Sequence, residues 1–305
     1  MRPLPDDILV LERGWLSSNN ILLLDDDRDD AILIDTGYVS HADQTLALVE
    51  QALQGRRLRA IVNTHLHSDH CGGNAALARR HSAPIWVPQS EYQAALDWDP
   101  ERLSFQVTGQ RCDRFVPGAA LKPGDTLHQG RRRWEVIGAP GHDPHALMLF
   151  DGQDGLLISA DALWENGFGV VFPELVGEPG FDDVRATLGL IRSLGARRVL
   201  PGHGSVFDDV EAAVDRALAK LAGFEADPVR HAWYAAKVLV KFHLLEVRCQ
   251  TWPELLAWLD ATPYVRLLHQ RYFSSQPWPA WQAAVLEALC ASGALRRDGE
   301  TILDV

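Results

Sequence analysis

Short apolar runs alternate with amphipathic stretches over about the first two hundred residues of the chain. Apolar runs typical of β-strands occupy residues 8–11, 21–24, 31–34, 58–62, 85–87, 134–137, 146–150, 156–159 and 199–200. Apolar positions at helical spacing predict helices over 41–54, 75–81, 91–96 and 182–194. Because strands and helices alternate, the pattern predicts a layered α/β fold. Residues 163–180, rich in glycine, proline and aromatic residues, are expected to form a long functional loop.

Helical periodicity dominates the chain after Asp208. Helices are expected near 209–222, 231–246, 253–260 and 279–291, and residues 293–303 are expected to form two short strands around Asp298-Gly299. A winged helix has this order of elements, helices followed by a hairpin. We therefore expect a first domain over residues 1–226 and a helical, winged-helix-like domain over residues 227–305, with the boundary near Asp227-Pro228.

Composition narrows the class of protein. The 305 residues, 47% hydrophobic and 23% charged, suit one large domain with a smaller appendage. No apolar run reaches the ~18 residues of a membrane span, and the acidic, proline-broken N-terminus differs from a signal peptide, so we expect a cytoplasmic protein. The formal net charge of −12 disfavours nonspecific binding to nucleic acid or to an anionic membrane. The four scattered cysteines are expected to be free thiols, with Cys71 packed behind its histidine neighbours.

Residues 65–70 concentrate the candidate chemistry. This segment holds His65, His67, Asp69 and His70 soon after the apolar run at 58–62. A buried carboxylate needs a partner, and clustered histidines repel one another when protonated. A divalent metal resolves both conflicts, because it binds neutral imidazole and ionised carboxylate. In an extended backbone His65 and His67 point the same way and can reach one ion, whereas Asp69 and His70 lie past the bend and can reach a second.

Three later segments each supply a further candidate ligand. His142 follows the run at 134–137, Asp161 follows the run at 156–159, and His203 follows the run at 199–200. Ligands at the carboxyl ends of several strands can converge on one edge of a layered fold. The sequence therefore predicts that four segments bring their candidate ligands to one edge of the fold.

In order and spacing, these seven residues resemble the metallo-β-lactamase superfamily, over about residues 8–206. The resemblance implies an αββα sandwich that carries two divalent metal ions. It implies that one ion is held by His65, His67 and His142 and the other by Asp69, His70 and His203. Asp161 would bridge the ions together with a water or hydroxide. We expect zinc, although iron, manganese and nickel suit the same ligands.

We interpret the chain as a metal-dependent hydrolase. A bound metal can lower the pKa of water to roughly 7, which makes hydroxide available for attack on an ester, thioester or lactone-type carbonyl. Asp69 is the candidate catalytic residue, which would orient the hydroxide and pass a proton to the leaving group. The segment from Thr64 to Asn74 is similar to the glyoxalase II branch, which hydrolyses thioesters, although lactonases and other relatives share it.

Other interpretations of the same ligands stay open. A ribonuclease or phosphodiesterase of the superfamily would need a basic groove, and an iron-dependent sulfur dioxygenase would use one metal. A flavodiiron oxidoreductase is disfavoured, because that branch carries glutamate where this chain has His67. A metal-binding sensor without enzymatic activity is the remaining alternative.

Two further residues are expected beside the ligands. Asp35 ends a predicted strand and would accept a hydrogen bond from a ligand or a backbone group, or else cap a turn. His145 lies three residues after His142 and is interpreted as a structural histidine next to the metals rather than as a ligand.

Aromatic residues are the candidates for the substrate pocket, with ordinary packing as the alternative for each one. They are Trp15, Trp164, Phe168 and Phe172. Basic and acidic residues nearly balance over 225–305, which argues against a nucleic-acid-binding winged helix. We expect this segment to form a lid over the active site or the contact of a homodimer, and the substrate to be a small molecule.

Overall fold

The computed structural model describes residues 3–305. Contacts divide the chain into two compact units. The first contains the residues up to 103 together with 112–222, and the second contains residues 104–111 together with 223–305. No helix among residues 3–305 has both the length and the hydropathy to cross a membrane.

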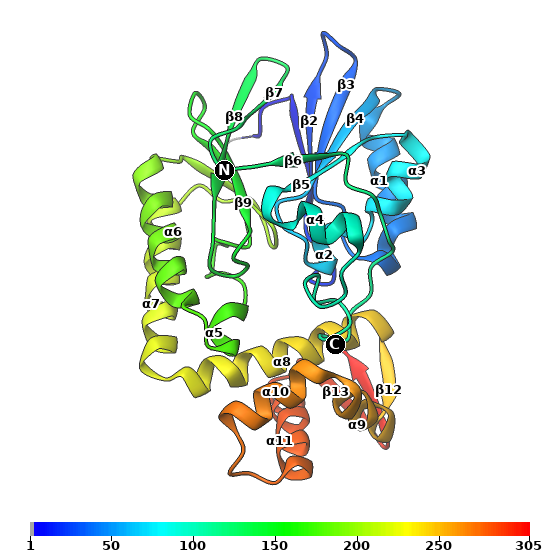
Figure 1. The fold of residues 1–305 in the computed structure, drawn as a ribbon, viewed down its shortest axis with the longest axis vertical. Helices are drawn as coiled ribbons and strands as arrows, with labels where there is room; N and C mark the ends of the chain where they lie inside the picture. The colour runs from blue at the N-terminus through cyan, green and yellow to red at the C-terminus, as the bar shows by residue number, and fades with distance from the viewer. Residues whose placement is uncertain (1–2) are drawn as a thin grey trace. The chain divides into compact units, whose positions relative to one another are not determined.

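Two β-sheets form the middle of the first unit (Figure 1). The strands are β1 (Ile8–Leu11), β2 (Asn20–Asp25), β3 (Asp30–Ile34), β4 (Arg57–Val62), β5 (Ile85–Pro88), β6 (Ala119–Leu121), β7 (Thr126–Gln129), β8 (Arg132–Gly138), β9 (Leu147–Asp151), β10 (Leu156–Ala160) and β11 (Arg198–Pro201). The first sheet has the order β1-β2-β3-β4-β5-β6, and the second has the order β11-β10-β9-β8-β7. The strands predicted from the apolar runs are therefore present, and the short strands β6 and β7 are additional.

The main core lies between the two sheets. Side chains two residues apart on β2 and β3, such as Ile21 and Leu23, belong to the same cluster as Trp134 and Val136 of β8. Trp134 is fully buried in this cluster. Because side chains alternate along a strand, one face of each strand supplies this core. The other faces of β2 and β3 are also buried, which accounts for their uninterrupted apolar runs.

Helices cover the outer faces of the sheets. The longer ones are α1 (Ala42–Leu53), α3 (Asn74–His81), α4 (Gln89–Asp97), α6 (Gly180–Leu194) and α7 (Val210–Ala226), and the short ones are η1 (Val39–His41), α2 (Ser68–Cys71) and α5 (Phe172–Val176). Figure 1 shows α1 and α3 on the side of the first sheet and α6 and α7 on the side of the second. The layers run helix, sheet, sheet, helix, which confirms the predicted αββα sandwich. The loop expected at 163–180 is interrupted by α5.

The second unit combines helices with a small sheet. Its elements are α8 (Pro228–Val247), β12 (Cys249–Thr251), α9 (Trp252–Ala261), α10 (Pro263–Tyr272), α11 (Trp278–Ala291), β13 (Leu295–Asp298) and β14 (Thr301–Asp304). The three strands pair antiparallel in the order β12-β14-β13. The predicted helical C-terminal region with its terminal hairpin is thus present, while α10 and β12 were not predicted. Asp227 caps α8 by accepting a hydrogen bond from Arg230 N, and Thr251 caps α9 with a capping box.

Residues 104–111 pack with the second unit although the chain around them belongs to the first. Val107 O accepts a hydrogen bond from Tyr264 N at 2.9 Å, and the side chain of Arg111 pairs with Glu246. Gly109 has a φ of +71° and runs against the Trp258 indole, where a side chain would have little room. These partners lie far along the chain, so local sequence patterns gave no sign of them.

Candidate metal centre

The candidate ligands lie at one edge of both sheets. β4 leads into residues 65–70, β8 into His142, β10 into Asp161 and β11 into His203. Leu147 N donates a hydrogen bond to Thr64 O at 2.8 Å and ties the two sheets together at this edge. Four segments that are far apart in the sequence therefore deliver their side chains to one place, as the strand ends predicted.

The first group of donors consists of His65, His67 and His142. His67 Nδ1 lies 3.1 Å from His65 Nε2 and 2.8 Å from His142 Nε2. Burial lowers the pKa of all three imidazoles, to about 4 for His67 and His142, so they are neutral at physiological pH. His142 Nδ1 faces Val170 O at 2.5 Å, which leaves Nε2 of a neutral His142 with a lone pair turned toward the other two rings.

The second group consists of Asp69, His70, Asp161 and His203. His203 Nε2 lies 3.0 Å from Asp69 Oδ2, and His70 Nε2 lies 3.5 Å from Asp161 Oδ1. The other oxygen of Asp161 lies 3.8 Å from His203 Nε2 and 3.5 Å from His142 Nε2. Asp161 therefore stands between the two groups of donors.

The second group concentrates negative charge in a buried place. Burial works against the charged form of Asp161, but His70 and His203 hold its pKa well below the usual range. Burial also lowers the pKa of His70, yet the carboxylates of Asp161, Asp35 and Asp69 outweigh it and raise that pKa well above the usual range. Among the described residues, no hydrogen bond reaches the buried His70 Nε2. The first group offers neutral imidazoles. The second offers carboxylates and His70 Nε2, which lacks a hydrogen-bond partner among the described residues. Together these donors fit a pair of divalent cations.

Asp35 contacts the segment of candidate ligands through both of its carboxylate oxygens. It accepts hydrogen bonds from Thr64 N at 2.9 Å and Thr64 Oγ1 at 2.8 Å, and its Oδ2 also lies 2.8 Å from His70 Nδ1. These are the two kinds of partner, a ligand and a backbone group, expected from the sequence. Its φ of +55° is unusual for a residue other than glycine, and such backbone strain is often retained beside functional sites.

Two buried carboxylates near His67 were not expected from the sequence. Asp143 Oδ2 lies 3.6 Å from His67 Nε2, and Asp143 Oδ1 accepts a hydrogen bond from His145 N at 2.7 Å. Glu91 of α4 is also buried, beside the backbone of Leu66. Burial and the charge of Asp143 raise the pKa of Glu91 well above its usual range. The sequence singled out His145 for its imidazole ring, but its contact with Asp143 is made by its backbone N–H.

Aromatic rings border both groups of donors. Trp15, 56% exposed, stacks on His203 with the ring centroids 5.3 Å apart and the planes inclined by 10°. Trp164 Nε1 donates a hydrogen bond to Asp161 Oδ1 at 3.1 Å. Phe172 lies edge-on to His67, with the ring centroids 5.2 Å apart.

Phe168 takes the alternative of ordinary packing. It is 1% exposed, and Lys220 Nζ lies 4.8 Å from the centroid of its ring and donates a hydrogen bond to its carbonyl oxygen at 2.9 Å. Its side chain therefore packs inside the protein, because the loop after β10 folds back over α7.

Cys71 is also buried and belongs to neither group of donors. Its Sγ lies 3.6 Å from Leu66 O and 3.7 Å from Cys112 Sγ. This agrees with a packing position behind the ligand segment.

Two glycines allow the close approach of backbone to the ligands. A Cβ on Gly202 would lie 2.3 Å from Asp161 Oδ1, and a Cβ on Gly169 would lie 2.3 Å from His142 Nδ1. Asn19 N donates a hydrogen bond to Gly202 O at 2.7 Å, and Ser18 N donates one to Asp69 O at 2.9 Å. The buried loop at residues 17–20 therefore clamps the backbone that carries Asp69 and His203.

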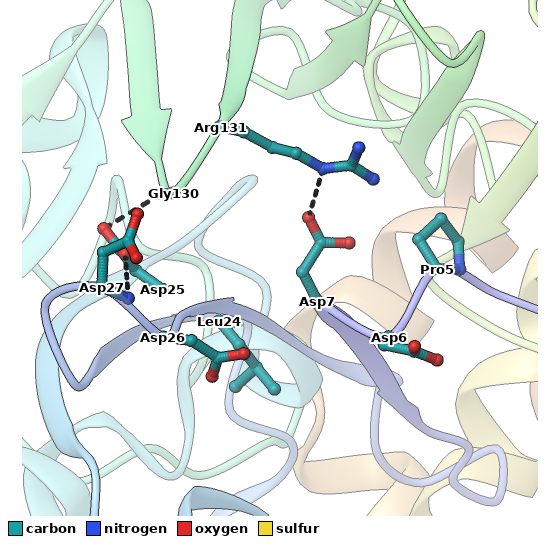
Figure 2. Close-up of a pocket in the computed structure, with 9 residues that line it drawn as sticks. All are labelled: Pro5, Asp6, Asp7, Leu24, Asp25, Asp26, Asp27, Gly130 and Arg131. Carbon is teal, nitrogen blue, oxygen red and sulfur yellow. Dashed lines mark hydrogen bonds and ion pairs between the residues drawn. The ribbon is translucent and has the colours of Figure 1, made fainter.

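A surface pocket of about 480 Å³ lies at the other end of β2 and β3 (Figure 2). Its lining consists of Pro5, Asp6, Asp7, Leu24, Asp25, Asp26, Asp27, Gly130 and Arg131. Asp7 forms an ion pair with Arg131 at 3.4 Å, and Asp25 accepts hydrogen bonds from Asp27 N at 3.1 Å and Gly130 N at 3.2 Å. These interactions hold two turns together, and this pocket contains none of the candidate ligands.

Known proteins match part of this chain in sequence. A family model described as the metallo-beta-lactamase superfamily matches residues 13–203. A hydroxyacylglutathione hydrolase of Chromohalobacter salexigens is 31% identical over 152 residues, which are 50% of this chain and 49% of that protein. The chain spans about half the length of the curated relatives that it matches.

Solved structures share the fold. A metallo-beta-lactamase family protein from Thermus thermophilus has a TM-score of 0.59 and 22% identity, covering 99% of this chain and 100% of that one. A protein crystallised in a di-iron-bound form has a TM-score of 0.55 and 23% identity, covering 68% of this chain and 98% of that one. At these identities the likeness concerns the fold alone.

Proposed function

The chain belongs to the metallo-β-lactamase superfamily, and from this membership we propose that it is a metal-dependent hydrolase that acts on an ester, thioester or lactone-type carbonyl. The observation that carries the proposal is the pair of adjacent donor groups with Asp161 between them. In the proposed enzyme, the first ion is held by His65, His67 and His142 and the second by Asp69, His70 and His203. Asp161 contributes to both, and residues up to 226 form the catalytic domain.

Two bound divalent ions would supply a water of lowered pKa, roughly 7, and would polarise the substrate carbonyl. The residues of the chain set up that chemistry. Asp69, whose Oδ2 lies 3.0 Å from His203 Nε2, would share the second ion with His203, and in this proposal it orients the attacking water and carries a proton to the leaving group. Trp164 fixes the carboxylate of Asp161 through its indole N–H.

The substrate in this proposal is a small molecule bound against aromatic rings. Trp15 and Trp164 flank His203, and Phe172 flanks His67. Apolar walls with a few convergent polar groups are typical of small-molecule sites. The hydroxyacylglutathione hydrolases among the relatives place glutathione thioesters first among the substrates to test.

The test combines metal analysis with a substrate panel. Purified protein is loaded with zinc or with iron, because one structural neighbour is described in a di-iron-bound form. Lactoylglutathione, other thioesters and lactones are then assayed beside single-stranded RNA, a phosphodiester, and oxygen uptake with glutathione persulfide. We expect hydrolysis of a carbonyl substrate with two bound metal ions per chain.

Variants separate the active centre from the rest of the molecule. Asp69→Ala is expected to remove nearly all turnover, whereas Asp27→Asn, an exposed aspartate in the pocket of Figure 2, is expected to leave it unchanged. A metal-loaded protein that cleaves RNA or consumes oxygen instead of hydrolysing any carbonyl substrate would contradict the proposal. Near-normal turnover by Asp69→Ala would contradict the role of Asp69.

A further inference from the structure

Each ligand histidine has two ring nitrogens, of which one can bind a metal ion and the other carries the proton of the neutral ring. A buried N–H needs an acceptor. Val170 O is in place for His142 Nδ1 at 2.5 Å, and Thr64 Oγ1 for His65 Nδ1 at 3.1 Å. His67 is turned the other way, because its Nδ1 faces the two other ligands. Its N–H is therefore on Nε2 when a metal ion is bound.

Asp143 faces this Nε2. Its Oδ2 lies 3.6 Å away, a few tenths of an ångström beyond an ordinary hydrogen bond. The side chain is fixed, because Asp143 is 8% exposed and its Oδ1 accepts a hydrogen bond from His145 N at 2.7 Å. The carboxylate therefore points at His67 without having to be reoriented.

The segment between the ligands is held as well. Glu91, which is buried on α4, lies beside the backbone of Leu66, between His65 and His67. The carbonyl oxygen of His67 accepts hydrogen bonds from His70 N at 2.9 Å and Cys71 N at 3.1 Å, so the backbone at His67 is held while its ring can still rotate. Asp143 is placed to restrict that rotation.

We propose that Asp143 is a positioning residue of the first donor group: it accepts the Nε2–H of His67 and so holds Nδ1 of His67 toward the metal ion. This inference rests on the proposed function, because it requires a metal ion in that group. Asp143 contacts the ring of His67 and acts only through it. A carboxylate acceptor forms a stronger hydrogen bond than a neutral one and makes the imidazole a better ligand.

The test is the metal affinity of the full chain with Asp143→Asn. Asparagine keeps the size of the side chain and can still accept a hydrogen bond from His145 N. It then turns an amide NH₂ group toward the Nε2–H of His67, so that two donors meet. Metal-free protein is titrated with zinc against a competing chelator dye. We expect the affinity of one of the two sites to fall by about 10- to 100-fold and the other to stay near the wild-type value.

Controls separate positioning from general damage. Asp25→Asn alters another buried turn-forming aspartate, at the far end of β2, and should bind two zinc ions as the wild type does. His145→Ala keeps the backbone N–H that Asp143 uses and should also bind normally. The melting temperature of metal-free Asp143→Asn should stay near that of the wild type. If this variant does not fold, Asp143→Ser, which retains a turn-capping oxygen, takes its place.

The two possible failures are distinguishable. A folded Asp143 variant with wild-type zinc affinity at both sites would overturn this inference and leave the proposed function standing. A wild-type protein that binds no zinc or iron at micromolar concentration would overturn the proposed function and this inference with it.

Discussion

The indole of Trp164 contacts Asp161, the proposed ligand between the two donor groups, and borders the proposed substrate site. Its Nε1 donates a hydrogen bond to Asp161 Oδ1 at 3.1 Å, while its ring lies edge-on to that of His203. A hydrogen bond to a charged group contributes about 1.5–3 kcal/mol. This side chain therefore affects the direction of a carboxylate and the shape of the proposed substrate site.

Trp164→Phe keeps an aromatic wall and removes the hydrogen bond. We expect kcat to fall about tenfold, since a loss of ~1.4 kcal/mol in the transition state is tenfold in rate. We expect KM to change little. Steady-state kinetics measure both values, and Trp15→Phe, which keeps a ring over His203, is the control expected to change KM more than kcat. Equal kcat in Trp164→Phe and the wild type would contradict this role.

Glu91 makes the stability of the metal-free protein depend on pH. Its ordinary pKa is 4.5, and burial in the folded state raises this pKa well above that value. From pH 4.5 up to the raised value the folded state keeps a proton that the unfolded state has lost, so stability falls as the pH rises through this interval. At lower pH both states are protonated, and the contribution disappears.

Glu91→Gln removes this titration and keeps the size of the side chain. In the presence of a chelator, we expect the variant to melt at a higher temperature than the wild type at pH 8, with the difference vanishing near pH 4. Melting curves across this pH range measure the effect. Glu101→Gln, at an exposed position, is the control expected to follow the wild type. A constant difference at all pH values would show that packing, not titration, distinguishes Glu91→Gln from the wild type.

At the scale of elements, the end of β11 depends on the absence of a side chain at Gly202. A Cβ there would lie 2.3 Å from Asp161 Oδ1 and 3.0 Å from the carbonyl carbon of Ala160. One of the two strands β10 and β11 must therefore shift to accept alanine. Such overpacking typically costs about 1–3 kcal/mol.

Gly202→Ala is expected to lower the metal content of the second donor group and the melting temperature together. Gly189→Ala in α6 is the matched control, because no atom lies within 4 Å of its Cβ position. This control should be neutral or more stable by up to ~1 kcal/mol, as alanine favours a helix over glycine. Elemental analysis and thermal unfolding measure both effects. Full metal content in Gly202→Ala would show that the loop adapts at no cost.

The predicted elements are specified by residues within their own segments. The elements that were missed depend on contacts with distant segments or have a weak pattern of their own. β2, β3, β4 and α6 follow from apolar runs or helical spacing within their own segments. β12 has three residues and is held by pairing with β14 near the end of the chain, so its own sequence carries little signal. The helix α10 begins at a proline and buries Val265 and Leu268 among its apolar residues, a stripe too narrow to have been recognised.

At the scale of the whole molecule, the sequence indicated the grouping of the candidate ligands and the position of Asp35 beside them, but not the positions of Asp143 and Glu91. A dense cluster of histidine and aspartate residues at strand ends is informative, because few roles other than metal binding suit such a cluster. No local pattern distinguishes Asp143 and Glu91, because single carboxylates are common in sequences. Only the folded chain brings them to His67 and Leu66. Phe168, for which a pocket and ordinary packing were both considered, is buried in the interior, and only the folded chain distinguishes the two.

Removing the metal ions should weaken the whole first unit. Without them, Asp69, His70 and Asp161 stay buried with their charges only partly compensated, which is costly inside a protein. A metal present at a thousand times its dissociation constant stabilises the folded state by about 4.1 kcal/mol. For a unit of this size, ~1 kcal/mol shifts the melting temperature by about 2–4 °C. We therefore expect chelation to lower the melting temperature by about 8–16 °C and zinc to restore it.

Scanning calorimetry of the same sample before chelation, after chelation and after addition of zinc measures this change. Asp161→Ala removes the carboxylate between the donor groups and should show a much smaller response to chelator and zinc. Asp27→Asn should respond as the wild type does, because it lies at the far end of β2 and β3. An equal melting temperature with and without metal would mean that the buried carboxylates are already compensated by the proton on His70, and that the donor groups do not bind a metal ion tightly.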